Sequence, residues 1–97
     1  MKLVINTCYG GFGLSEAAKK RYIELAGAAP KSWYDLKRND KYLVQVVEEL
    51  HHAANGSCAK LSVVCIEPGC WYRIDEYDGL ETVQLKDLDT DWQLATD

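Results

Sequence analysis

The sequence predicts an α+β fold, with two helices packed on one face of a mixed sheet of about four strands, in the order β-α-α-β-β-β. Three observations predict it: a glycine-rich turn between an apolar strand and a helix start, an amphipathic segment near the middle, and a β-prone second half with an Asp-Gly hairpin signal. Such elements pack as two layers around one core. We expect residues 1–86 to form a single α+β domain and residues 87–97 to form an acidic C-terminal tail.

Size and composition favour one small globular domain. The chain has 97 residues, of which 47% are hydrophobic, and this suffices for one core but leaves no room for a second domain. Its apolar runs are far shorter than the ~20 residues that a membrane-spanning helix needs, and the N-terminus lacks the pattern of a secretion signal. We therefore expect a cytoplasmic protein whose four cysteines are free thiols.

The first strand and helix are predicted on either side of the glycine-rich turn. Lys2–Cys8 contains three consecutive apolar residues, a pattern typical of an interior strand that is covered on both faces. The glycines of Gly10–Gly13 permit a sharp turn. Ser15 is then expected to cap a helix that runs to about Ala26, and Gly27 to end it.

Residues 28–39 are predicted to form a loop, because Pro30 interrupts any continuous helix there. Trp33 and Tyr34 lie within this loop. They are expected either to cover the core or to form an exposed aromatic contact for a ligand or partner.

The second helix is expected from Lys41 to about Ala54. Asp40 precedes it as a plausible N-cap, and apolar residues recur at helical spacing along it. Asn55-Gly56 is expected to end the helix with a left-handed cap.

The second half predicts three strands, at Ala59–Ile66, Trp71–Tyr77 and Leu80–Leu85. Asp78-Gly79 is a strong hairpin signal, because a two-residue type I′ turn needs positive φ at both central positions. If the strand that begins near Ala59 lies beside the first strand, we expect the two to be parallel and joined by a right-handed crossover.

Charge is divided unevenly along the chain. Residues 1–66 hold nine Lys or Arg and six Asp or Glu, for a net +3, whereas residues 67–97 hold two basic and nine acidic residues, for a net −7. A concentrated acidic region attracts basic partners and repels nucleic acid, so direct binding of DNA or RNA is not expected. The hairpin and tail are predicted to present a partner-binding set of carboxylates: Asp75, Glu76, Asp78, Glu81, Asp87 and Asp89.

The glycine-rich turn is also a candidate ligand site. A strand, a glycine-rich turn and a helix start can hold phosphate, because free N–H groups and the helix dipole point at the anion. The spacing matches neither the dinucleotide fingerprint nor the P-loop. Two interpretations of the turn are thus open. It is either a cradle for an anion, made by Gly10, Gly11, Gly13 and Ser15, or a purely structural turn that lets strand and helix pack closely.

No pattern of residues indicates catalysis, a bound metal or a cofactor. Cys65 and Cys70 are separated by four residues, and the adjacent His51 and His52 point about 100° apart on a helix, so zinc binding is not expected. Cys8 follows the first strand and could act as a nucleophile only with a nearby base. We expect Cys8 and Cys65 to be buried structural residues, His51 to flank its helix, and the protein not to be an enzyme.

Three stretches of the chain carry a family resemblance: the opening Asn6–Ser15, which reads Asn-Thr-Cys-Tyr-Gly-Gly-Phe-Gly-Leu-Ser, the central Leu43–Leu50, and the closing Ile74–Glu81, which reads Ile-Asp-Glu-Tyr-Asp-Gly-Leu-Glu. Together they resemble a family of small uncharacterised proteins from bacteriophage and prophage genomes. The resemblance spans most of residues 1–85. It implies a viral setting in the host cytoplasm and brings no catalytic residue with it.

The leading hypothesis is a non-enzymatic phage inhibitor that binds a host nucleic-acid-handling or defence complex, such as a CRISPR effector, through its acidic C-terminal surface. The alternative is a binder of a nucleotide or another phosphate-containing ligand at the glycine-rich turn. A structural role within the phage particle is a third interpretation. A further alternative is that the protein forms a homodimer through a free edge of its sheet.

Overall fold

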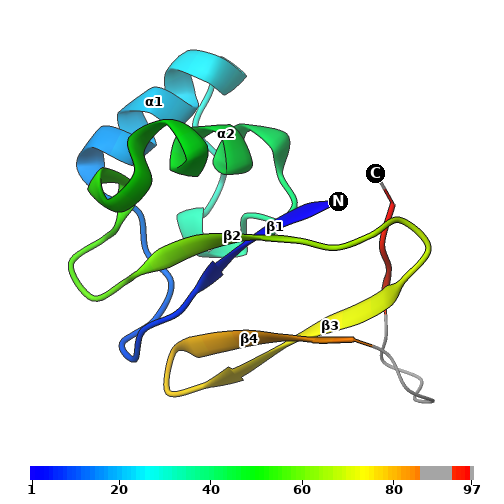
Figure 1. Cartoon of the computed structure of the whole chain (residues 1–97). Helices are drawn as coiled ribbons and strands as arrows, with labels where there is room; N and C mark the ends of the chain where they lie inside the picture. Colours follow the sequence, from blue (N-terminus) through cyan, green and yellow to red (C-terminus); the bar gives the residue numbers. More distant parts are fainter. Residues whose placement is uncertain (86–92, 97) are drawn as a thin grey trace.

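The structure, a computed structural model, describes residues 1–85 and 93–96 (Figure 1). It confirms the α+β class and the predicted order of helices and strands. The strands are β1 (Lys2–Asn6), β2 (Leu61–Cys65), β3 (Trp71–Tyr77), β4 (Leu80–Leu85) and β5 (Gln93–Leu94). The helices are α1 (Glu16–Ala26) and α2 (Lys41–Leu50), and the short 3-10 helices are η1 (Trp33–Asp35) and η2 (His51–Ala54).

The strands form two separate sheets in place of the single mixed sheet that was predicted. One sheet pairs β1 with β2, and the other has the order β4-β3-β5. All described pairings are antiparallel, with Val4 opposite Val63 in the first sheet and Ile74 opposite Val83 in the second. In Figure 1 the helices cover one side of the β1–β2 pair and the β3–β4 hairpin lies on the other side.

The prediction that β1 and β2 run parallel is wrong. They are neighbours, but they run in opposite directions. Figure 1 shows why: the chain leaves β1, returns along α1, reverses again along α2 and enters β2 from the end at which β1 finished. In a parallel pair, the connection must bring the chain back to the end of the sheet at which the first strand began. The helices α1 and α2 run in opposite directions, so they leave the chain at the end at which β1 finished.

The predicted start and end of α1 are confirmed. The Ser15 side chain accepts a hydrogen bond from the Ala18 N–H, and Gly27 ends the helix with a left-handed φ of 86°. Tyr22 and Ala18 are buried on the inner face of the helix. The first helix therefore follows its local sequence signals closely.

The second helix begins as predicted and ends earlier than predicted. Asp40 caps α2 by accepting hydrogen bonds from two backbone N–H groups. The α-helix ends at Leu50, His51 takes a positive φ of 53°, and the chain continues as η2. Asn55 is extended and does not form the expected left-handed cap. Its backbone instead forms a bridge with Leu14, next to the glycine-rich turn.

Strand β1 lies between two clusters of apolar side chains, which confirms it as an interior strand. Val4 belongs to the larger cluster, formed with the helices, and Leu3 belongs to a smaller cluster that includes Tyr72 of β3. Cys8 and Cys65 are exposed, so the prediction that both are buried is wrong. Cys8 lies beyond the end of β1, and Cys65 is the last residue of β2.

The end of the chain is partly incorporated into the second sheet. Gln93 and Leu94 pair with Tyr72 and Trp71, and Ala95 is buried in the smaller apolar cluster. The described part of the predicted tail is therefore attached to the domain, and residues 87–92 and 97 lie outside the described residues. Among the described residues, no helix is long and apolar enough to cross a membrane.

A partly buried hydrogen bond fastens α1 to the start of α2. The Tyr22 hydroxyl donates to Asp40 Oδ2 at 2.9 Å, while Asp40 Oδ1 caps α2. Burial, followed by the hydrogen bond to Asp40, raises the pKa of Tyr22 from its ordinary value of 10.0 to about 12. The neutral phenol thus stabilises the fold below about pH 10, and this contribution is lost as the pH rises toward 12.

We predict that Tyr22→Phe lowers the free energy of unfolding by about 1 kcal/mol near neutral pH, because Asp40 loses a hydrogen-bond donor. Near pH 11 the wild-type phenol ionises in the unfolded chain first, so the difference between wild type and variant should fall by about 1 kcal/mol. Urea unfolding at both pH values measures it. Tyr34→Phe, at an exposed ring, is the neutral-pH control and should change nothing. A difference that is equally large near pH 11 would contradict the account.

Candidate functional site

A cleft of about 880 Å³ lies beside the glycine-rich turn, and we call it the glycine cleft. Its walls come from four parts of the chain that are distant in sequence. They are the turn and helix start at residues 10–16 with Lys19, the aromatic pair Trp33 and Tyr34 with Arg38, the loop at residues 55–58, and the hairpin residues Glu76, Gly79 and Glu81. A cleft of this size can accept a small molecule or a few residues of a peptide.

The glycines of the turn are needed for close backbone packing. Gly10 and Gly11 have positive φ angles of 118° and 103°. A Cβ on Gly79, at the tip of the hairpin, would lie 2.6 Å from the Gly11 Cα and nearer still to its nitrogen. The Gly10 N–H also donates to the Asp78 carbonyl at 3.0 Å. The hairpin tip therefore rests directly on the turn, with no side chain between them.

The residues of the predicted phosphate cradle lie together on the wall of the cleft, but some of their hydrogen-bonding groups already have partners within the chain. Gly10, Gly11, Gly13 and Ser15 all line the cleft. The Ser15 hydroxyl donates to the Ala53 carbonyl at 2.7 Å and caps α1. Gly13 has open space where a Cβ would be, so it is the one glycine of the turn that neither a positive φ nor a close neighbour requires. Phosphate binding stays a prediction.

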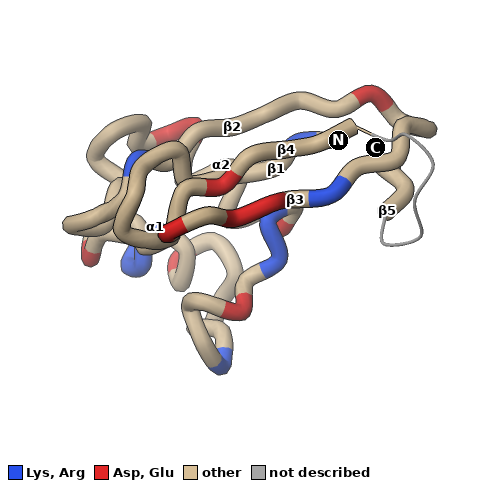
Figure 2. Tube along the Cα trace, turned by 90° about the horizontal axis from the view of Figure 1, so that it is seen from below, with Lys and Arg blue, Asp and Glu red and all other residues tan. Residues whose placement is uncertain are grey.

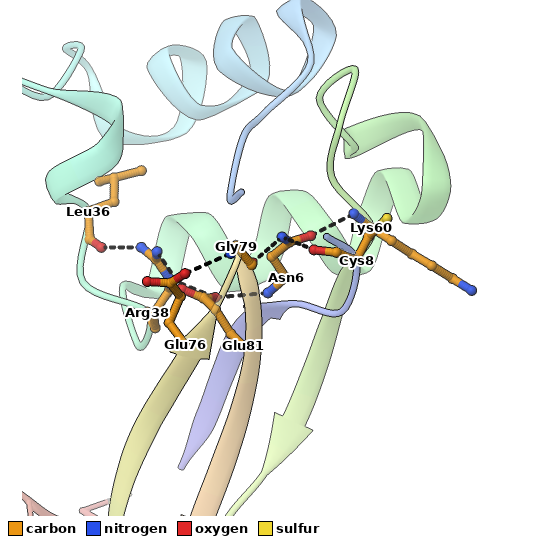
Figure 3. A network of polar contacts seen from close by, with 8 residues as sticks. All are labelled: Asn6, Cys8, Leu36, Arg38, Lys60, Glu76, Gly79 and Glu81. Carbon is orange, nitrogen blue, oxygen red and sulfur yellow. Dashed lines mark hydrogen bonds and ion pairs between the residues drawn. The ribbon is translucent and has the colours of Figure 1, made fainter. Parts of the chain in front are cut away.

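A buried asparagine organises the contact between β1 and the hairpin (Figure 3). Asn6 is fully buried, and its Nδ2 donates to the carbonyls of Cys8 at 2.7 Å and Gly79 at 2.6 Å. Its Oδ1 accepts the Lys60 N–H at 2.8 Å, and its own N–H donates to Glu81 Oε1 at 2.9 Å. One side chain thereby joins the end of β1, the hairpin turn and the start of β2.

Glu81 is buried, which corrects the prediction that it faces solvent for a partner. Only 7% of the residue is exposed, and its carboxylate forms an ion pair with Arg38, with Nη2 at 2.9 Å from Oε2. Arg38 also donates to the Leu36 carbonyl at 3.0 Å and lies over the Phe12 ring, with 3.7 Å from Cζ to the ring centre. The charges of both residues are thus matched inside the fold.

The sequence contained a signal for this burial. The two-residue turn at Asp78-Gly79 places Glu81 opposite Glu76, which alternation puts on the same face as Tyr72 and Ile74. That face is the one covered by β1. The sequence did not reveal Asn6 and Arg38 as members of this network. Each of them contacts Glu81 from more than forty residues away, and nothing local indicates such a contact.

The other predicted carboxylates divide between two sides of the hairpin. Asp78 is exposed in the turn, where its φ of 51° and that of Gly79, 87°, confirm the predicted type I′ geometry. Asp75 faces outward and contacts Arg73, with 3.0 Å between Oδ1 and Nε. Glu76 faces the glycine cleft and accepts the Gly79 N–H at 2.6 Å. Figure 2 shows these acidic positions gathered at the turn end of the hairpin.

Two of the predicted carboxylates, Asp87 and Asp89, lie outside the described residues. Their part in a partner-binding surface stays a prediction.

The two aromatic residues of the predicted loop have different environments. They belong to η1, a short helix within the predicted loop, with Ser32 as its cap. Trp33 packs edge-on against Tyr22 with 5.5 Å between ring centres, so it covers the core. Tyr34 is 77% exposed and lines the cleft. Each of the two predicted roles therefore fits one residue of the pair.

The cysteine and histidine candidates are scattered. Cys58 borders the glycine cleft and is exposed, like Cys8. His51 and His52 are exposed on η2, so His51 flanks its helix as predicted. Within the described residues, no group of three His, Cys, Asp or Glu side chains converges to hold a metal ion.

No protein-family model, curated protein or solved structure matched the chain. Inference about function therefore rests on the glycine cleft, the hairpin and the distribution of charge.

We predict that Gly79→Ala destabilises the protein far more than Gly69→Ala. Both glycines have positive φ angles, 87° and 92°, so both variants carry backbone strain of about 1 kcal/mol. Only at Gly79 does the new methyl group meet the backbone of Gly11, whereas Gly69 has open space around it. We expect an additional loss of about 2 kcal/mol or more for Gly79→Ala in urea unfolding. Equal losses would mean that the hairpin does not rest on the turn.

Proposed function

We propose that this protein is a non-enzymatic phage inhibitor that binds a basic surface of a host nucleic-acid-handling or defence complex, such as a CRISPR effector. The proposal is carried by one observation: a tyrosine and two carboxylates stand on the outward side of a hairpin that is firmly held at its tip. We call Asp75, Tyr77 and Asp78 the outer hairpin surface. The phage setting rests on the sequence resemblance.

The outer hairpin surface has the chemistry of a protein interface. Tyr77 is 72% exposed, and Asp78 beside it is exposed in the turn. Exposed tyrosines are enriched at protein interfaces, because the ring offers a large contact area and the hydroxyl a hydrogen bond. Tyr9 is also exposed, and it directly precedes Gly10, whose N–H donates a hydrogen bond to the Asp78 carbonyl.

The rigidity of the hairpin favours binding. The Gly79 carbonyl accepts from Asn6, and the Asp78 carbonyl accepts from Gly10. A surface that is already ordered loses little conformational entropy when a partner docks. The same hairpin belongs to the segment with a net charge of −7, which draws a basic partner in and keeps nucleic acid away.

The test is inhibition of target-DNA binding by purified CRISPR effector complexes of several types, measured by gel shift. We expect wild-type protein to weaken DNA binding by at least one of them. We expect the combined variant Asp75→Asn, Tyr77→Ala and Asp78→Asn to need about tenfold more protein for the same inhibition. Asparagine tolerates positive φ, so Asp78→Asn preserves the turn.

A matched control removes the same number of carboxylates elsewhere. Glu24→Gln combined with Asp35→Asn changes two exposed residues far along the chain from the hairpin, and this variant should inhibit like wild type. If the control loses as much activity as the hairpin variant, net charge alone is responsible. If no complex is inhibited by wild-type protein, the inhibitor proposal is wrong.

A further inference from the structure

The charged groups that line the glycine cleft are almost all paired within the chain. Arg38 pairs with Glu81 at 2.9 Å. Lys19 pairs with Glu16 at 3.7 Å. Among the described lining residues there are three carboxylates and two cations, so one carboxylate is left over. That residue is Glu76, which belongs to no ion pair within the described part of the chain.

The aromatic rings of the cleft show the same pattern. Phe12 lies beneath the Arg38 guanidinium, and Trp33 packs against Tyr22 with the Lys19 ammonium 5.9 Å from its ring centre. Tyr34 is the remaining ring, and no ring or cation contacts it among the described residues. The cleft therefore already holds two of the chain's own cations against aromatic faces and offers one further ring and one further carboxylate.

We propose that the glycine cleft binds an arginine side chain of the partner, through the Glu76 carboxylate and the Tyr34 ring. This inference deepens the proposed function and rests on it for the partner. The carboxylate supplies a charge-assisted hydrogen bond to the guanidinium, and the phenol ring supplies a face on which a planar cation stacks. Arginine fits better than lysine, because only the guanidinium is planar and can use both groups at once.

The charge of the cleft favours this occupant over an anion. A phosphate would meet Glu16, Glu76 and Glu81 in the same space, and the Arg38 and Lys19 charges are already matched by two of them. The Gly10 N–H is also occupied by the Asp78 carbonyl. An arginine side chain adds the positive charge that the cleft lacks, and a basic partner surface supplies such side chains in abundance.

The cleft and the outer hairpin surface lie on opposite faces of β3. Glu76 points to the cleft side, and its neighbours Asp75 and Tyr77 point to the other side. The two surfaces can thus be changed separately, although they share one hairpin. A partner that grips the hairpin would contact both.

The experiment titrates the isolated protein with a short capped peptide of alternating glycine and arginine. Binding is followed by amide and indole chemical shifts in NMR spectra. We expect shifts at Gly11, Gly13, Tyr34 and the Trp33 indole, with a Kd of about 1 mM or tighter. The same peptide with citrulline in place of arginine keeps the shape, lacks the charge, and should not bind.

Substitutions on each side of β3 separate cleft binding from general attraction. Glu76→Gln should weaken binding about tenfold and Tyr34→Ala about threefold. Both preserve the fold, because glutamine can still accept the Gly79 N–H and Tyr34 is exposed. Asp78→Asn removes one charge outside the cleft and should stay within about twofold of wild type.

Several results would overturn the proposal. One is a loss of peptide affinity in Asp78→Asn as large as that in Glu76→Gln. The others are binding of the citrulline peptide as tight as that of the arginine peptide, or chemical-shift changes confined to residues outside the cleft. Shifts at Gly11 and Gly13 on addition of inorganic phosphate, without peptide binding, would assign the cleft to anions instead. The assay contains no host complex, so its failure leaves the inhibition test of the outer hairpin surface standing. Conversely, if the peptide binds but no complex is inhibited, the proposal that the cleft binds arginine stands and the inhibitor function is rejected.

Discussion

The contact of Asn6 and Arg38 with Glu81 is the interaction on which the rest of the structure depends. It joins β1, the loop before α2 and the β3–β4 hairpin at one buried point (Figure 3). Among the described residues, no strand of one sheet pairs with a strand of the other, so the sheets are joined by side chains and by the hydrogen bond from the Gly10 N–H to the Asp78 carbonyl. Loss of one member of a buried ion pair leaves the other without a partner and costs about 3 kcal/mol or more. Such a cost is a large part of the stability of a domain of this size.

The glycine-rich turn also holds the β3–β4 hairpin against the end of β1, through contacts of its backbone with the hairpin tip. Gly11 and Gly79 bring two backbones together without side chains, and the Gly10 N–H closes the contact on Asp78. The cleft beside them exists because the turn, η1 and the hairpin converge there. Structure and candidate function are thus linked through the hairpin, since the groups that fix it also place Glu76 in the cleft and leave Tyr77 outside.

Local signals in the sequence were sufficient for most of the elements. Ser15 and Asp40 cap their helices, and Asp78-Gly79 makes the predicted turn, because each of these depends on the few residues around it. The direction of β2 could not be predicted in the same way. It depends on how α1 and α2 lie relative to one another, and no short stretch of sequence specifies that.

The candidate site was predicted in part. The glycine-rich turn and the hairpin were both singled out, but nothing in their sequences shows that they touch. Glu81 was expected in solvent together with the other hairpin carboxylates, yet the hairpin register already placed it on the face of Ile74 and Tyr72. Arg38 lies in the predicted loop of residues 28–39, where nothing local in the sequence indicates its partner. The pairing of Arg38 with Glu81 arises from tertiary packing across 43 residues of sequence.

Amide hydrogen exchange at Asn6 tests the central claim most directly. This N–H belongs to the end of a strand, but its acceptor is the Glu81 carboxylate and not a neighbouring strand. The account predicts protection of the Asn6 amide similar to that of Val4, with a loss on the order of a hundredfold in Glu81→Ala while amides within α2 remain protected. An Asn6 amide that exchanges in wild-type protein as fast as an unstructured peptide, or one that is indifferent to Glu81→Ala, would contradict it.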